Sequence, residues 1–242
     1  MHNICSKTFF TFLTLFFVIS ISIPCFAFSP SSNNFYQGID VSHWQEDIDF
    51  ALVKSSGIQV VYIKSSEGKN YVDPYFEKNY YNAKANDLKV GFYHYVTAQN
   101  EENAKEQAIF FARVIAGKSL DCRLAMDFED FGSLSISEIN NISKVFLETL
   151  EQETGSQVLI YSNAYSARNI FSIELTKYPL WVANYNVSSP SGNGKWQTWV
   201  RMAVYKYRNC KSVFLGMLIE INLQMVYFYL MRKFYLLQMT QT

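Results

Sequence analysis

The chain has 242 residues, and its 21 basic and 21 acidic side chains give a formal net charge of zero. This balance argues against the strongly basic surface that binding to nucleic acid or to an anionic membrane requires. Apolar residues make up 49% of the sequence and aromatic residues 17%, which predicts a large packed core and excludes extensive disorder. The length fits one domain of medium size.

The first 27 residues have the layout of a secretory signal peptide. Lys7 precedes a long apolar run, which is followed by the helix-breaking Pro24 and by small residues around Ala27. We expect cleavage after Ala27 and a short polar linker over residues 28–34. Two alternatives stay open: the run is long enough to span a bilayer as an uncleaved anchor, and Cys25 suggests a lipoprotein, although "SIPC" lacks the usual small residues before the cysteine. The expected location is outside the cell or in the cell wall, without a stable membrane partner.

From residue 35 onward, short apolar runs alternate with helical segments. The predicted strands span residues 38–44 (ending in a turn), 60–68, 90–96, 123–130, 157–163 and 180–185. The predicted helices span residues 47–57, 73–89, 100–118 and 135–155. Gly57 closes the first helix, Asp73 caps the second with Pro74 in its first turn, and Ser135 with Glu138 forms a capping box for the last.

Strands that alternate with helices of this length predict βαβ units and a parallel sheet, and their nearly continuous apolar character predicts burial on both faces. The number of units favours an α/β barrel, whose active site lies at the carboxyl ends of the strands. Polar residues gather at those ends of the predicted strands: Asp40, Glu67, Tyr93 to Tyr95, Asp127, Glu129, Tyr161 and Asn163. One rim of one barrel is therefore expected to hold them all.

The stretch "RLAMDFEDFG", residues 123–132, ends an apolar run in three carboxylates. If it is one strand, Asp127 and Glu129 point to the same face with α-carbons roughly 7 Å apart. Two like charges so close together indicate catalysis or a bound cation, although solvated charges at a strand end are an alternative. Asp40 has a competing interpretation as a cap or turn residue, and His94 as a core residue.

No metal or cofactor is predicted. The sequence has three histidines, no CxxC pair, and neither the GxGxxG nor the GxxxxGK[ST] phosphate loop. Cys122 and Cys210 follow the predicted signal peptide, and nothing in their spacing demands a disulfide. Six aromatic rings at the barrel mouth suit either packing or stacking against sugar faces: Trp44, Tyr62, Tyr93, Tyr95, Tyr161 and Trp181.

Six motifs in order carry a resemblance: "GIDVSHWQ", "YIKSSEGKNYVDPYF", "VGFYHY", "AMDFED", "IYSN" and "LWVANY". Together they resemble the family 25 glycoside hydrolases, the lysozymes of bacteria, phages and fungi, from about residue 35 to residue 199. The resemblance implies a modified TIM-type (β/α)5(β)3 barrel over residues 35–200 that cleaves the β-1,4 bond between N-acetylmuramic acid and N-acetylglucosamine in peptidoglycan.

The resemblance also implies roles for the site residues. Glu129 becomes the general acid, Asp127 orients or stabilises the acetamido group of the substrate, and Asp40 is a third acidic residue of the pocket. Clustered carboxylates raise one another's pKa, so one stays protonated beside an ionised neighbour. Which one is protonated is left open. The expected substrate contacts are Tyr62, Glu67, Tyr93, Tyr95, Tyr161 and Trp181, and the expected partner of this monomer is the peptidoglycan glycan strand.

Two rival functions stay open. A family 18 chitinase needs acidic residues where this chain has Cys122 and Ala125, which counts against it. A wall-binding protein that keeps the pocket without catalysis is the rival from a different class.

Residues 201–242 depart from the family pattern. The Trp-Gln-Tyr strand and the Gly-Asn-Val-Asp segment, with its fourth acidic residue, are absent after Trp199. Their loss predicts a missing or altered last strand and an open seam in the barrel. A membrane helix is an alternative, but Glu220, Asn222 and Gln224 would be costly inside a bilayer.

We hypothesise that the tail reflects shifts of reading frame. If residues 202–205 are encoded ATG-GCA-GTA-TAC, reading one base later gives Trp-Gln-Tyr. If residues 215–221 are encoded CTG-GGA-ATG-TTG-ATA-GAG-ATA, reading from the third base gives Gly-Asn-Val-Asp-Arg-Asp. Coding DNA whose shifted frames lack both motifs would contradict the hypothesis.

Overall fold

The structure is a computed structural model that describes residues 35–183, 196, 199–204 and 217–222. The predicted signal peptide, the linker and Cys210 lie outside these residues. Of residues 201–242, only two strands are described.

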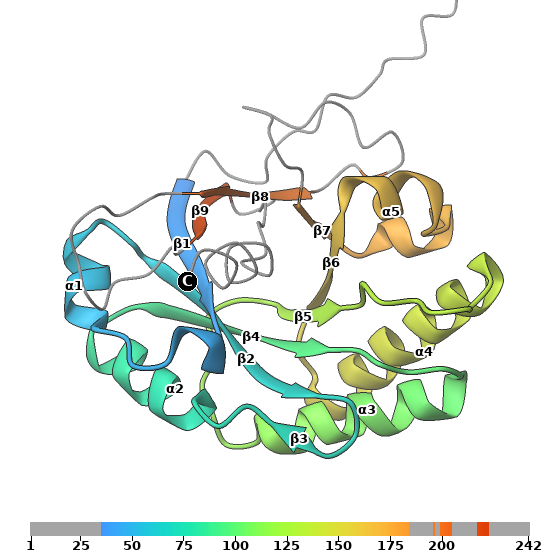
Figure 1. The fold of residues 1–242 in the computed structure, drawn as a ribbon, viewed down its shortest axis with the longest axis horizontal. Coiled ribbons are helices and arrows are strands. Elements are labelled where there is room, and N and C mark those ends of the chain that lie inside the picture. The colour runs from blue at the N-terminus through green and yellow to red at the C-terminus, as the bar shows by residue number, and fades with distance from the viewer. Residues whose placement is uncertain (1–34, 184–195, 197–198, 205–216, 223–242) are drawn as a thin grey trace, which may run out of the picture.

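One curled sheet organises the described part of the chain. Its strands are β1 (Phe35–Val41), β2 (Val60–Glu67), β3 (Tyr71–Val72), β4 (Lys89–Tyr95), β5 (Leu124–Asp127), β6 (Val158–Asn163), β7 (Leu180–Ala183), β8 (Trp199–Val204) and β9 (Met217–Asn222). They are ordered β1-β9-β8-β7-β6-β5-β4-β2-β3, and β1 pairs with β2 as well (Figure 1). The pairings therefore return to the strand from which they began.

Most neighbours in the sheet are parallel, as the alternation of strands and helices predicted. β1, β2, β4, β5, β6, β7 and β8 pair in parallel, each with the next. The short β3 runs antiparallel to β2, and β9 runs antiparallel to both β8 and β1. Parallel strands bring their carboxyl ends to one rim, where the predicted site lies.

The structure does not have the predicted open seam. Residues 199–204 and 217–222 form β8 and β9, and β9 bridges β8 to β1 through both of its edges. A sheet ladder is made by backbone groups, and apolar and β-branched residues such as those of "MLIEIN" favour strands. The altered tail therefore still supplies strands that pair.

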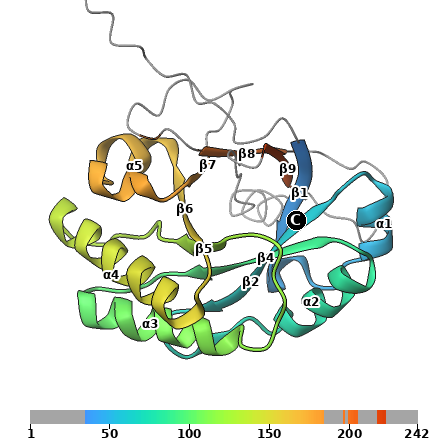
Figure 2. The same ribbon diagram turned by 180° about the vertical axis from the view of Figure 1, so that it is seen from behind.

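Helices flank the strands from outside. They are α1 (Phe50–Ser55), α2 (Phe76–Ala85), α3 (Glu101–Val114), α4 (Ile136–Thr154) and α5 (Ala164–Asn169), with 3-10 turns η1 (His43–Gln45) and η2 (Ile173–Lys177). Both views show α2, α3 and α4 along the outer side of β2, β4 and β5, while α5 lies beside β6 and β7 (Figure 1 and Figure 2). Strands covered in this way bury both faces: Val90, Phe92 and Ala125 are fully inaccessible.

The helix ends agree with the sequence predictions in one case and differ in another. Ser135 and Glu138 form the predicted capping box of α4, and Gly155 ends that helix in the left-handed conformation. The prediction for α2 was wrong, because that helix begins at Phe76 and its N-cap is Tyr75. Asp73 instead accepts hydrogen bonds at the site rim.

The strand predicted over residues 123–130 is shorter. β5 ends at Asp127, level with Tyr95, the last residue of β4, so the parallel ladder stops there. Glu129 consequently lies in the loop beyond the strand. The idea that Asp127 and Glu129 share one strand face is therefore wrong, although their side chains do meet.

Candidate active site

Three carboxyl groups converge at the carboxyl ends of the strands. Asp40 lies near the end of β1, Asp127 ends β5, and Glu129 follows two residues later. Asp127 is 7% exposed, whereas Asp40 and Glu129 are half-buried.

Burial is the main cause that raises the pKa of Asp127 well above its ordinary value. The charge of Glu129 raises the pKa of Asp127 further, the charge of Lys64 opposes the rise, and a hydrogen bond with Glu129 and the charge of Asp40 add to it. The Oδ1 atom of Asp127 has no hydrogen-bond partner among the described residues. A buried carboxyl with a raised pKa and a spare acceptor atom is suited to contact a substrate group.

Burial also raises the pKa of Asp40 well above its ordinary value, against a backbone hydrogen bond that lowers it. The charge of Glu129 adds to the rise. Tyr93 completes the cluster: burial raises the pKa of its hydroxyl, and so do the charges of Asp40 and Asp127. The cluster therefore keeps a proton at higher pH than isolated carboxyl groups do.

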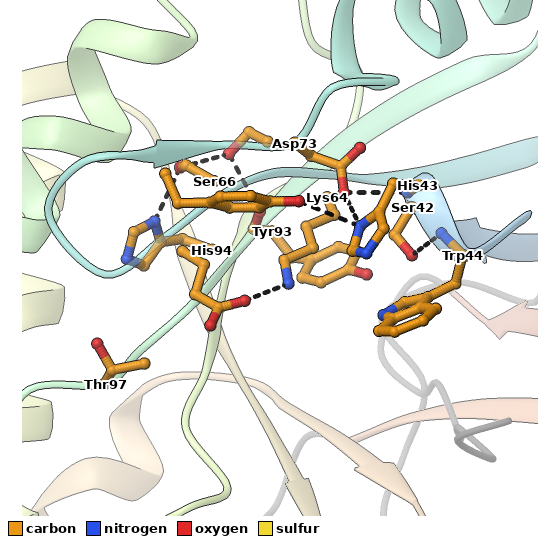
Figure 3. Close-up of polar contacts among 12 residues, drawn as sticks. Ser42, His43, Trp44, Lys64, Ser66, Asp73, Tyr93, His94 and Thr97 are labelled. Atoms are coloured by element: carbon orange, nitrogen blue, oxygen red, sulfur yellow. Dashed lines mark hydrogen bonds and ion pairs between the residues drawn. The ribbon is translucent and has the colours of Figure 1, made fainter. Parts of the chain in front are cut away.

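A buried cation lies beside these acids. Lys64 on β2 is 7% exposed, and its Nζ atom lies 2.6 Å from Oε2 of Glu67 (Figure 3). The same Nζ atom lies 5.2 Å from the ring centre of Tyr95, which is the register partner of Asp127. Glu67, predicted as a substrate contact, thus neutralises part of the charge of Lys64.

Comparison with known protein families identifies the family to which this chain belongs. The sequence matches the family model of glycosyl hydrolases family 25 over residues 39–213, which is well over half of the chain. The chain belongs to this family.

Relatives within family 25 include named lysozymes. The chain is 37% identical to the autolytic lysozyme of Clostridium acetobutylicum over 155 residues, which are 64% of this chain and 47% of that protein. It is 34% identical to lysozyme M1 of Streptomyces globisporus, over 70% of this chain and 62% of the relative. The chain therefore spans only about half to two thirds of these relatives.

A solved structure supports the same fold. The crystal structure of the bacterial lysozyme from Streptomyces coelicolor superposes with a TM-score of 0.63 at 29% identity, over 78% of this chain and 91% of that one.

The aromatic residues predicted as substrate contacts occupy two different environments. Tyr93 and Tyr95 are half-buried near the carboxyl end of β4. Tyr62, Tyr161 and Trp181 are 3%, 3% and 1% exposed, and their rings contact one another, with centroids 4.6 Å apart for Tyr62 and Trp181. Their contact with a substrate stays a prediction.

Tyr62 has a clear packing role. Its ring lies against Gly91, where an added Cβ would come within 2.6 Å of a ring carbon, so only glycine leaves room. Cys122 lies on the same side, and burial raises the pKa of its thiol to about 12. Cys122 forms no disulfide among the described residues, and a disulfide with Cys210 is untested because Cys210 lies outside them.

The sequence did not reveal a second polar cluster at the rim. Asp73 accepts hydrogen bonds from the backbone N–H of His43 at 3.0 Å and contacts His43 Nδ1 at 2.8 Å (Figure 3). The ring centroid of His43 lies 4.5 Å from that of Trp44, which is 67% exposed, and 6.2 Å from that of Tyr71, which meets it edge-on. The segments "SHW" and "YVD" are far apart in the sequence and become neighbours only through the pairing of β1 with β2 and of β2 with β3. The sequence alone therefore gave no signal for this cluster.

The described residues offer neither a metal site nor a membrane-spanning helix. In that part of the chain, no three histidine, cysteine, aspartate or glutamate side chains are placed to hold a metal ion. No helix among the described residues is long and apolar enough to cross a membrane.

Proposed function

We propose that this family 25 chain is a muramidase that hydrolyses the β-1,4 bond between N-acetylmuramic acid and N-acetylglucosamine in peptidoglycan. The observation that carries the proposal is the placement of Asp40, Asp127 and Glu129 at or just beyond the carboxyl ends of β1 and β5, where the charge of Glu129 raises the pKa of both aspartates. The lysozyme names of the relatives at 37% and 34% identity support it.

In the proposed mechanism, Glu129 donates its proton to the leaving glycosidic oxygen as the bond to the anomeric carbon breaks. Asp127 accepts a hydrogen bond from the N–H of the substrate's 2-acetamido group, whose carbonyl oxygen attacks the anomeric carbon. Water then adds to that carbon, and the Glu129 carboxylate takes a proton from the water. The unpartnered Oδ1 of Asp127 supports its role as acceptor.

The proposal includes a (β/α)5(β)3 barrel and a location outside the cell. The element order, in which five strand-helix units precede three final strands once the β3 hairpin is set aside, supports a (β/α)5(β)3 barrel. We further propose a secreted monomer that acts on cell-wall glycan strands without metal or cofactor. The apolar N-terminal run of the sequence supports export.

A wall-binding protein without catalysis is the second candidate. The observation that favours it is the departure of the sequence after Trp199, where the Gly-Asn-Val-Asp segment expected to supply a fourth acidic residue is absent. Such a chain keeps the rings at the rim and the affinity for glycan while turnover is lost.

Digestion of purified peptidoglycan separates these candidates. The unmutated chain, Glu129→Gln and the exposed-site control Glu153→Gln are incubated with the substrate, and product ends are identified by mass spectrometry after borohydride reduction. We expect reduced muramic acid ends from the unmutated chain and the control, and a loss of at least about 100-fold in Glu129→Gln, as for removal of a general acid.

Other outcomes are equally informative. Reduced glucosamine ends would make the chain a glucosaminidase. A folded chain that binds peptidoglycan but releases no ends would support the wall-binding candidate, and full activity in Glu129→Gln would refute the assignment of the acid.

A further inference from the structure

The rim of the barrel carries an exposed aromatic surface that the proposed reaction does not use. Trp44 is 67% exposed and Tyr71 is 38% exposed, and both are among the few large apolar side chains that the described residues leave open to solvent. The ring of His43 lies between them, with its centroid 4.5 Å from that of Trp44 and 6.2 Å from that of Tyr71. We call Trp44, His43 and Tyr71 the rim platform. An exposed apolar patch bordered by polar groups commonly marks a binding site.

The short turn η1 holds Trp44 in place. Ser42 Oγ accepts a hydrogen bond from the backbone N–H of Trp44 at 3.3 Å, and the backbone N–H of Ser42 donates to Gln45 Oε1 at 2.7 Å (Figure 3). Glu46, which ends the turn, has φ 49° and ψ −129°, a conformation that favours glycine. The chain therefore maintains a strained turn that presents an indole ring to solvent, and strain of this kind is concentrated at functional sites.

A buried carboxylate fixes the ring of His43. Asp73 is 1% exposed, and its Oδ2 atom accepts the backbone N–H of His43 at 3.0 Å and lies 2.8 Å from His43 Nδ1. Its Oδ1 atom accepts the backbone N–H of Tyr75 at 3.0 Å, so both oxygens are held. Because a carboxylate only accepts, Nδ1 donates to it, and Nε2 of the neutral ring is an acceptor that has no hydrogen-bond partner among the described residues.

One end of the rim platform is continuous with β1. Asp40 lies in β1, which ends at Val41, and His43 and Trp44 follow after the single residue Ser42. The α-carbons of Asp40 and Trp44 are four residues apart, so they are separated by at most about 14 Å. Trp44 is therefore within a short distance of the first of the three acids.

The other end of the rim platform reaches β4. Lys64 Nζ lies 5.8 Å from the ring centre of Tyr71 and 5.2 Å from that of Tyr95. Tyr95 is the register partner of Asp127 in the sheet. The platform therefore borders the part of the rim where the acids lie, and a polymer bound across the acids is placed to extend onto it.

The chemistry of the rim platform fits a sugar ring. His43 lies against one side of the Trp44 ring, with 36° between the two planes, and the rest of the indole is open. A flat apolar ring suits stacking on the apolar face of a pyranose. The free Nε2 atom of His43 beside it suits a hydroxyl or amide N–H at the edge of the same sugar, because binding sites combine an apolar surface with a few polar groups.

The charges next to Trp44 favour a neutral sugar over a stem peptide. Glu46 and Asp47 follow shortly after Trp44 in the chain, and both are exposed. Asp47 pairs with Lys78, whereas Glu46 has no ion pair among the described residues. The carboxylates of a peptidoglycan stem peptide would be repelled by Glu46, but an N-acetylglucosamine unit carries no charge.

We propose that the rim platform is an outer sugar-binding subsite, where Trp44 stacks on an N-acetylglucosamine unit beyond the two sugars that flank the cleaved bond and His43 Nε2 accepts a hydrogen bond from that unit. The substrate class rests on the proposed function. Trp44 and His43 bind substrate without a part in bond cleavage, and Asp73 is a positioning residue because it acts through His43.

Binding of soluble β-1,4-linked N-acetylglucosamine oligomers tests the subsite without turnover. Calorimetry in the Glu129→Gln background compares the disaccharide with the hexasaccharide. We expect Trp44→Ala to weaken binding of the hexasaccharide about tenfold, the loss typical of truncating an aromatic anchor. The effect on the disaccharide should be smaller, because a short ligand bound at the acids does not reach the platform. Trp44→Phe should restore part of the affinity.

A second exposed ring supplies the matched control. Tyr81 on the outer helix α2 is 62% exposed, so Tyr81→Ala removes a comparable ring outside the rim and should leave the affinity unchanged. His43→Ala should weaken binding less than Trp44→Ala. The double variant should lose less than the sum of the two, because His43 also supports the indole.

Kinetics on peptidoglycan separate this inference from the proposed function. In the otherwise unmutated chain, Trp44→Ala should raise KM about tenfold and leave kcat unchanged, as for a contact made equally in the ground state and the transition state. Unchanged hexasaccharide affinity and unchanged KM in Trp44→Ala would overturn the subsite while muramic acid ends from the unmutated chain uphold the proposed function.

The remaining outcomes are also decisive. Hexasaccharide binding that depends on Trp44 in a chain that releases no ends would uphold the subsite and refute the hydrolysis. A chain that neither binds the oligomers nor cleaves peptidoglycan would refute both. A soluble stem peptide whose binding depends on Trp44, in place of the oligomers, would assign the platform to peptide and overturn the proposal.

Discussion

At the scale of single residues, Asp127 lies where its ionised form lowers the stability of the fold. A carboxyl that is nearly inaccessible and faces two further acids favours its neutral form, whereas the proposed mechanism needs it as an acceptor. Lys64 reduces this conflict, and the spare Oδ1 atom leaves room for a substrate N–H. Active-site residues commonly oppose stability in this way.

Asp127→Asn should therefore stabilise the fold at high pH. A carboxyl whose folded pKa is raised contributes stability below its unfolded pKa of about 3.9, and that contribution is lost as pH rises through the folded pKa. Asparagine does not titrate, so we expect a free energy of unfolding at pH 8 that is higher than that of the unmutated chain, and a smaller difference at pH 4. Denaturant unfolding at pH 4 and pH 8 measures this.

Asp121 offers a control with the opposite sign. A hydrogen bond from Val90 N and the ion pair with Lys84 outweigh its partial burial and lower its pKa, so Asp121→Asn should lose stability at pH 8. A gain in stability at pH 8 in Asp121→Asn, or a loss in Asp127→Asn, would contradict this account of the site.

At the scale of elements, the neutral His94 links β4 to α3 and makes the contact sensitive to acid. Its Nε2 atom lies 3.4 Å from Gln107 Oε1, and its Nδ1 atom lies 2.8 Å from Ser66 Oγ. The unfolded chain binds a proton below pH 6.5, but the folded chain does not until about pH 3. A depressed folded pKa of a base means that stability falls as pH drops through this window, by about 1.4 kcal/mol per pH unit.

His94→Gln should remove that acid sensitivity. Glutamine keeps a donor and an acceptor for Ser66 and Gln107 but does not titrate. We expect the difference in unfolding free energy between the unmutated chain and His94→Gln to shrink by roughly 3 kcal/mol from pH 7 to pH 4. Chemical denaturation at the two pH values checks this, and a difference that stays constant would mean that His94 binds its proton inside the fold.

The elements also show how far local sequence signals reach. Hydrophobic runs and caps predicted the parallel strands and the N-cap of α4 at Ser135, because these depend on neighbours a few residues away. The early end of β5, the β-bulge at Ser65 in β2 and the rim cluster of His43 with Asp73 depend on which strand lies alongside. The pattern within one segment does not reveal which strand will lie beside it. The sequence therefore identified the acidic residues of the site but not the neighbouring groups that shift their pKa values.

At the scale of the whole molecule, the ring of strands depends on the altered tail. The family motifs predicted the barrel up to residue 199, and their absence afterwards predicted an open seam. Backbone pairing does not require those motifs, and β9 still pairs with β8 on one edge and β1 on the other. Closure and catalytic competence are therefore separate properties of this chain, since strands can pair without supplying the expected fourth acid.

A proline in β9 tests whether this closure holds the fold together. Ile219 pairs with Gly38 of β1 and with Met202 of β8, so it occupies a central position in the ladder. Ile219→Pro removes a backbone donor and fixes φ in a position where proline is not tolerated. We expect about 3 kcal/mol or more to be lost from the free energy of unfolding, together with aggregation through the exposed edges of β1 and β8.

Ile136→Pro is the matched control. Ile136 is 57% exposed and is the first residue of α4, a position that favours proline because its N–H has no partner within the helix. Ser135 before it already has the extended ψ of 160° that a following proline needs. Thermal unfolding should therefore separate the two variants by many degrees, and equal stability would mean that residues 217–222 contribute little to the folded barrel.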